Sequence, residues 1–104
     1  MLIRKRLNDK VANLQKLTHA VAHRHRLAIL YLLSHGSKAT YELADTLIIK
    51  EPLLVHHLEI MVKSGWIRRI RQGRRVWYEL EKTPFVELMK FLGDTPFFRD
   101  LRSR

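Results

Sequence analysis

The chain has 104 residues, which is enough for one domain with a modest hydrophobic core and too few for two ordinary domains. Its 20 Lys and Arg residues against 10 Asp and Glu give a net charge of +10, so a polyanion is the first partner to consider. The absence of cysteine excludes disulfides, thiolate metal sites and cysteine nucleophiles, and no apolar run approaches membrane-spanning length.

The first segment, residues 1–22, predicts an amphipathic helix. Leu7, Val11 and Leu14 are spaced by threes and fours, which places them on one stripe of a helix. Residues 1–26 carry seven basic residues and one acidic residue, so the other faces are positively charged. In so small a chain, a long amphipathic first helix favours docking on a second copy, and an ordinary core helix is the alternative.

Three further helices are predicted between residues 24 and 65. Residues 24–34 are apolar on nearly every side, which predicts a central, buried helix ended by His35-Gly36. The stretch SKATYELADTL predicts a short amphipathic helix with Tyr41 among its apolar positions. In KEPLLVHHLEIM, Pro52 fits the first turn of a helix that Ser64-Gly65 ends. The inward stripe of this helix is predicted to be Leu54, Leu58, Met61 and Val62.

The stretch WIRRIRQGRRVWYEL predicts a β-hairpin. Two β-prone runs flank the tight-turn pair Gln72-Gly73. Residues 66–82 carry six basic residues and two acidic ones. A hairpin tip of this charge suits phosphate contacts or insertion into a minor groove, and a solvated charged turn is the alternative. The candidate contacts on the hairpin are Arg68, Arg69, Arg71, Gln72, Arg74 and Arg75.

The C-terminal residues 83–104 predict a helical segment. Thr83-Pro84 opens a helix that runs through Gly93, and Thr95-Pro96 opens a short aromatic segment. The fold class expected is mainly α with a small β-hairpin, as one domain over residues 1–104. Residues 1–22 form its first helix, residues 23–82 a winged helix-turn-helix core, and residues 83–104 its C-terminal segment.

Residues 19–80 resemble the ArsR-type family of bacterial and archaeal regulators. Five short motifs carry the resemblance, in the family's order: His25-Arg26-Leu27, Glu42-Leu43-Ala44, His56-His57-Leu58, Ser64-Gly65-Trp66-Ile67 and the wing Gln72-Gly73-Arg74-Arg75-Val76-Trp77-Tyr78. The resemblance implies a winged helix-turn-helix regulator that binds double-stranded DNA as a homodimer. It also implies dimerisation through the first and last helices, with the candidate residues Leu7, Val11, Leu14, Phe85, Leu88, Met89 and Leu92.

The family's metal sites do not carry over to this sequence. Where metal-sensing members have cysteines at the start of the third helix, this chain has Ala39, Thr40 and Tyr41. Other members bind zinc through histidines of the last helix, and residues 83–104 contain none. His19 and His23 are four residues apart and would share a helical face, but two ligands are too few for zinc unless a partner chain supplies a third. We therefore expect surface histidines, with no metal and no cofactor, and zinc binding by this pair is the minority alternative.

The recognition helix also departs from the family pattern. Its first residues are Lys50, Glu51, Pro52, Leu53, Leu54 and Val55, in place of several hydrogen-bonding side chains. The candidate base contacts are Lys50, Leu53, His56 and His57, with Leu53 suited to a thymine methyl group. A packing role for His57 is an equal alternative. Arg26 is a candidate phosphate contact, and a role in bracing the fold is an equal alternative for it. Strong electrostatic affinity with weak hydrogen-bonded readout is predicted.

Three functions remain compatible with these residues. The first is a DNA-binding transcriptional regulator, acting as a repressor or an architectural protein. The second is a protein-interaction module that binds an unidentified protein through Leu53 and Val55, and the third is RNA binding through the wing. No catalytic triad or phosphate-binding glycine loop indicates an enzyme. The N-terminal MLIRKRLNDK lacks the apolar core of a signal peptide, and we expect a cytoplasmic protein.

Overall fold

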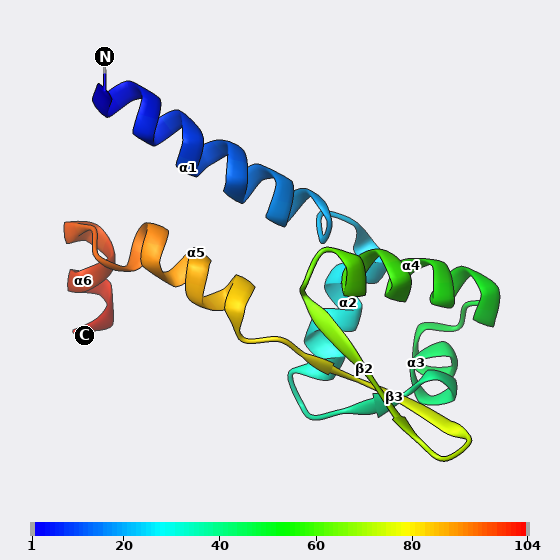
Figure 1. Cartoon of the computed structure of the whole chain (residues 1–104). Coiled ribbons are helices and arrows are strands. Elements are labelled where there is room, and N and C mark those ends of the chain that lie inside the picture. The colour runs from blue at the N-terminus through cyan, green and yellow to red at the C-terminus, as the bar shows by residue number, and fades with distance from the viewer. Residues whose placement is uncertain (1, 104) are drawn as a thin grey trace.

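The computed structural model describes residues 2–103, and the side chains of residues 5–103. Within this range the elements follow the order α1 (Leu2–His19), α2 (Arg24–Leu33), β1 (Lys38–Ala39), α3 (Thr40–Leu47), α4 (Glu51–Lys63), β2 (Ile67–Gln72), β3 (Arg75–Leu80), α5 (Thr83–Gly93) and α6 (Pro96–Arg102). The predicted fold class is confirmed: a mainly α chain in which a helix-turn-helix is followed by a hairpin (Figure 1).

The hydrophobic core lies where α2, α3 and α4 meet the sheet. Each helix contributes side chains that are almost fully buried: Ile29 from α2, Leu43 from α3, and Leu54, Leu58 and Met61 from α4. These α4 residues are the stripe that the sequence predicts, and Val62 is partly buried beside them. Trp66, Ile67 and Tyr78 close the core from the strand side.

The sheet has three strands in the order β1-β3-β2, all antiparallel, instead of the two predicted. The added strand β1 pairs Lys38 with Tyr78 and is only two residues long, too short for any alternating pattern. The predicted turn pair Gln72-Gly73 is wrong by one residue. Gln72 pairs with Arg75, so the two-residue turn is Gly73-Arg74, and Gly73 supplies the positive φ of 63°.

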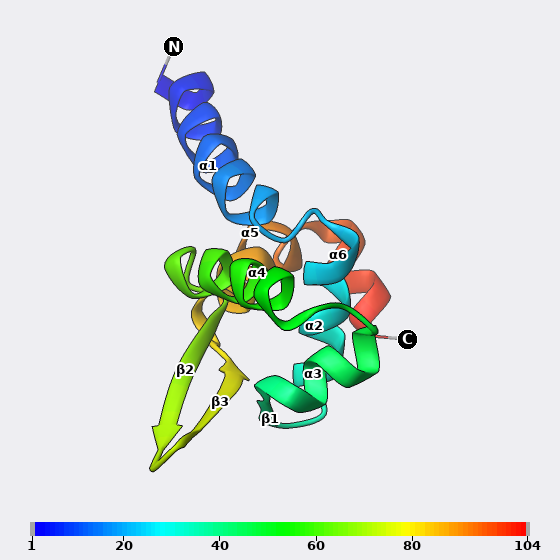
Figure 2. The ribbon, with the colours of Figure 1, turned by 90° about the vertical axis from the view of Figure 1, so that its right-hand side faces the viewer.

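Helices α1 and α5 leave the body of the molecule together, and α1 projects well beyond it (Figure 1, Figure 2). Trp66 ties α1 to the core, because its indole Nε1 donates a hydrogen bond to the carbonyl oxygen of Leu17 at 2.8 Å. The Phe85 ring of α5 meets Trp66 edge-on, with ring centres 5.1 Å apart. Among the described residues, every helix is too short or too polar to span a lipid bilayer.

Helix α2 is central, but it is not buried on every side as predicted. Ile29 and Leu33 face the core, whereas Leu27 is 54% exposed. Tyr41 of α3 is exposed as well. In a single chain these helices have neighbours on one side only, so the apolar residues on their outer faces meet solvent.

Candidate nucleic-acid interface

Helix α4 presents a mixed surface at its N-terminal end. The turn before it is sharp, because Ile48 adopts the left-handed conformation (φ 53°, ψ 50°), and its side chain is 89% exposed. Lys50 is the N-cap residue and Pro52 lies in the first turn, as the sequence predicts. Leu53 is 44% exposed and His56 is exposed, while Leu54 between them is buried. Lys50, Leu53 and His56 therefore lie on the accessible face of the helix.

The wing tip carries the free positive charge of the hairpin. The side chains of Arg71, Arg74 and Arg75 are exposed, and none of them forms a hydrogen bond or ion pair with another described residue. Arg74 and Arg75 line a hollow of about 390 Å³ together with Glu51 and the start of α3. The wing tip and the beginning of α4 are thus parts of one continuous surface.

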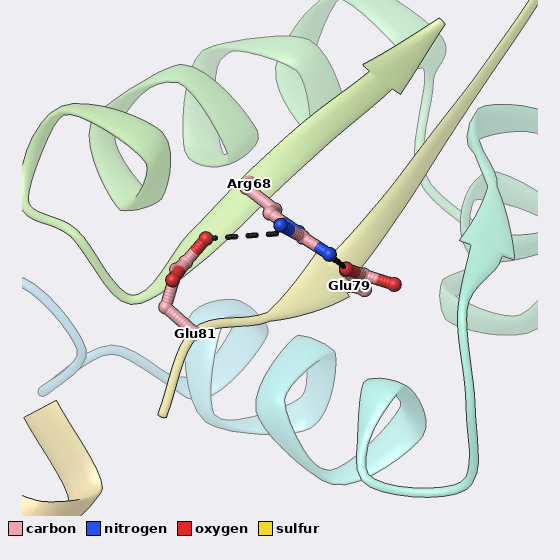
Figure 3. Close-up of polar contacts among 3 residues, drawn as sticks. All are labelled: Arg68, Glu79 and Glu81. Atoms are coloured by element: carbon pink, nitrogen blue, oxygen red, sulfur yellow. Dashed lines mark hydrogen bonds and ion pairs between the residues drawn. The ribbon is translucent and has the colours of Figure 1, made fainter. Parts of the chain in front are cut away.

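The two arginines nearer the base of the hairpin are engaged within the chain. Arg68 forms ion pairs with Glu79 on the neighbouring strand and with Glu81 at 3.7 Å (Figure 3). Arg69 lies over the ring of Tyr78, and its Nε donates to the Tyr78 hydroxyl oxygen at 3.3 Å. The ion pairs offset the charge of Arg68, and the contact with Tyr78 holds the side chain of Arg69 against the strand. The arginine side chains without any such contact are therefore those at the tip of the wing.

His57 is 4% exposed, which supports its alternative role as a packing residue. Its Nδ1 accepts a hydrogen bond from Arg26 Nε at 3.1 Å, and Arg26 also donates from a terminal nitrogen to the carbonyl oxygen of Ala20. Arg26 therefore braces α2 against both α4 and the α1–α2 connection. Burial first, and then the neighbouring positive charges and imidazoles, lower the pKa of His57 to about 4.

The histidine pair considered from the sequence is not formed on one helix. Helix α1 ends at His19, and His23 lies beyond the turn as the N-cap residue of α2. His23 instead lies beside His25 and His57. His57, the partner that was missed, is more than thirty residues from His23 in sequence. The only signal in the sequence was that residues 23–25 and residues 56–57 each contain neighbouring histidines.

The candidate dimerisation residues divide into two groups. Phe85 and Leu88 pack against the core of their own chain, and Leu14 is partly buried between α1 and α5. The others present apolar surface to solvent: Leu7, Val11, Met89 and Leu92. Met89, at 66%, is the most exposed of this set. The exposed group lies on α1 and α5, the two helices that leave the body of the molecule.

A helix-turn-helix followed by a basic hairpin defines a winged helix-turn-helix protein. The sequence model described as bacterial regulatory protein, arsR family, matches residues 23–69. A solved ArsR family transcriptional regulator is 31% identical, with a TM-score of 0.71, over 89% of this chain and 94% of its own. The chain therefore belongs to the ArsR family of bacterial regulatory proteins, as its resemblance over residues 19–80 predicts. The named members that it matches are transcriptional regulators and not enzymes.

Two further proteins are similar to this chain. HlyU from Vibrio cholerae is 25% identical, with a TM-score of 0.69, over 80% of this chain and 90% of its own. The HTH-type transcriptional repressor SmtB of Mycobacterium tuberculosis is 35% identical over 65 residues, which are 62% of this chain and 48% of SmtB. The chain thus matches about half the length of that curated relative.

Proposed function

We propose that this protein binds double-stranded DNA as a homodimer and represses transcription. The observation that carries the proposal is the wing tip, where the side chains of Arg71, Arg74 and Arg75 are exposed and form no hydrogen bond or ion pair with the described residues. Guanidinium groups on such a tip suit phosphate contacts and insertion into the minor groove. Membership of the ArsR family and the similarity to a relative named as a repressor support the proposal.

The proposed reading surface is the exposed face of α4. Lys50 and His56 supply hydrogen-bond donors, and Leu53 suits the methyl group of thymine. His57 is left out of this surface because it is buried against Arg26. With so few polar groups on α4, most of the binding free energy comes from phosphate contacts, and base preference is modest.

The proposed dimer joins the apolar faces of α1 and α5 to those of a second copy. Leu7, Val11, Met89 and Leu92 are exposed in the single chain and would be covered in the pair. Thiolate metal sensing is excluded from the proposal because the chain has no cysteine. A regulator that binds chromosomal DNA works in the cytoplasm of a prokaryotic cell, so the proposal places the protein there.

A protein-interaction module is the second candidate function. Leu53, 44% exposed on α4, and Ile48, 89% exposed in the turn before it, offer apolar surface to a partner protein, whereas Val55, the other residue predicted for this role, is half-buried. The unpaired arginines of the wing tip favour DNA over this alternative, because they add charge beside the same surface.

The test is a fluorescence anisotropy titration against a random-sequence DNA duplex at several salt concentrations. We expect tight binding at low salt that weakens steeply as salt rises, and selection from a random pool then measures base preference. A duplex RNA of the same sequence is titrated in parallel, because its deep, narrow major groove does not admit α4. Equal or tighter binding to RNA would favour the RNA-binding alternative. No binding to either duplex at low salt would reject the proposal and favour the protein-interaction module.

A further inference from the structure

Three histidine side chains meet between the start of α2 and the middle of α4. His23 is the N-cap residue of α2, His25 lies in the first turn of that helix, and His57 comes from α4. Each offers a ring nitrogen, and these three nitrogens lie within 4.8 Å of one another. The cluster lies away from both the start of α3 and the last helices, the positions considered above for a family metal site.

The separations of the three ring centres are close to those of a tetrahedral metal centre. With a zinc–nitrogen distance of about 2.05 Å and the ring centre roughly 1.1 Å further back, tetrahedral angles place the ring centres about 5.2 Å apart. The observed separations are 5.5 Å between His23 and His25, 4.6 Å between His23 and His57, and 5.4 Å between His25 and His57. Rotation of the rings in place would aim their nitrogens at a common centre.

Two of the histidines have a ring nitrogen free for a ligand. His25 Nδ1 is buried and has no hydrogen-bond partner among the described residues, an arrangement that costs free energy unless another group satisfies it. His23 uses its Nδ1 to accept from the backbone N–H of His25 at 3.1 Å, which leaves its Nε2 for another contact. The cluster thus contains one buried ring nitrogen, His25 Nδ1, that the packing of the helices leaves without a partner, and one accessible ring nitrogen on His23.

The third histidine is held by Arg26. Because Arg26 Nε donates to His57 Nδ1, the proton of the neutral ring lies on Nε2. A cation bound at Nδ1 displaces Arg26, and a cation bound at Nε2 moves the proton to Nδ1, where it no longer accepts from Arg26. Either route exchanges the Arg26–His57 hydrogen bond for a metal–nitrogen bond.

We propose that His23, His25 and His57 bind one zinc ion and so link the start of α2 to the recognition helix α4. Three neutral imidazoles suit zinc and the later first-row divalent cations, and do not suit Mg²⁺ or Ca²⁺, which take oxygen ligands. A water molecule or an anion completes the four ligands. Arg24 and Arg26 next to the cluster repel a dication, so we expect micromolar affinity and a preference for an anionic fourth ligand. The proposal does not depend on DNA binding.

The experiment uses the full chain, freed of any affinity tag and stripped of metal with a chelator, and titrates it with zinc by calorimetry. We expect one zinc ion per chain and a rise in Tm, because a ligand that binds only the folded state stabilises it. Titration with Mg²⁺ serves as the negative control. The absence of saturable zinc binding, or a stoichiometry well away from one, would overturn the proposal.

Two variants and one matched control locate the site. His23→Asn removes the imidazole and keeps a side chain that caps α2 well, and His25→Ala removes the buried nitrogen. Each is expected to weaken zinc binding at least tenfold, whereas His19→Ala, which also removes one histidine of this region, leaves it unchanged. Loss of binding in His19→Ala, or wild-type affinity in both site variants, would reject these ligands.

A measurement on the unmodified chain guards against variants that fail to fold. Zinc should shift the ring-proton NMR signals of three of the six histidines and leave those of His19 and His35 in place. Shifts confined to His19 or His35 would assign zinc to another site and contradict the proposal.

Discussion

The double substitution Arg74→Ala/Arg75→Ala is expected to reduce the salt dependence of DNA binding by a calculable amount. Both side chains are exposed at the wing tip and neither is paired within the described chain. Each phosphate that a cation neutralises contributes about 0.9 to the slope of log K against log salt. A dimer with two wings loses four such cations, so its slope becomes shallower by up to about 3.6.

The same four contacts set the loss of affinity at a given salt concentration. The counterion contribution vanishes at 1 M salt, so the change in slope can be extrapolated from that concentration. At 0.15 M salt, removal of the four contacts is then expected to weaken binding by up to about a thousandfold. The loss should be equal on unrelated DNA sequences, because phosphate contacts carry no base information. Anisotropy titrations on two unrelated duplexes at four salt concentrations measure both quantities.

The matched control is Arg99→Ala/Arg102→Ala, which removes the same charge from α6, away from the wing (Figure 1). Its slope should stay close to the wild-type value, since α6 is not part of the proposed interface. An unchanged slope in the wing variant would refute the wing assignment. An equal change in both variants would show that net charge, and not the wing tip, sets the affinity.

Three further predictions concern folding and assembly. Trp66→Phe keeps most of the buried ring but removes the donor to the Leu17 carbonyl, and should lower the free energy of unfolding by about 1–3 kcal/mol in urea denaturation. Met89→Glu places charge on the exposed face of α5 and should convert a dimer to a monomer by light scattering; a variant that remains dimeric contradicts the proposed interface. Because the pKa of His57 is lowered to about 4, the unfolded chain binds a proton that the folded chain does not below pH 6.5. The Tm of metal-stripped protein should therefore fall between pH 6.5 and pH 4, and a constant Tm would contradict the burial of a neutral imidazole.

Helices were predictable here because their apolar residues recur at helical spacing. The stripe of α4 through Leu54, Leu58 and Met61 emerged as predicted, since three residues of one face must meet the same core. Strand β1 could not be predicted, because two residues carry no period and their pairing depends on a partner strand forty positions away. The turn was placed one residue too early because either Gln72-Gly73 or Gly73-Arg74 puts the glycine within a two-residue turn.

The site was predictable as a basic hairpin but not in its internal pairing. Arg68 and Arg71 are alike in the sequence, yet Arg68 lies opposite Glu79 on the neighbouring strand and Arg71 lies opposite Val76. Cross-strand register decides which charge is offset, and a sequence pattern does not give that register to the residue. The histidine cluster could not be predicted for a similar reason, since only the packing of α4 on α2 brings His57 to His23 and His25.

The apolar start of the recognition helix becomes intelligible once the wing is placed beside it. Glu51, which would repel a phosphate backbone by itself, lines the same hollow as Arg74 and Arg75, so the local field there is net positive. Affinity can then reside in the wing, while α4 contributes shape and a methyl contact through Leu53. If affinity and base preference are separated in this way, Leu53→Ser should alter the preference at one base pair with little change in the salt slope. Removal of the wing arginines should instead change the salt slope and leave the base preference as it is. A change in slope equal to that of the wing variant would show that α4 also governs the phosphate contacts.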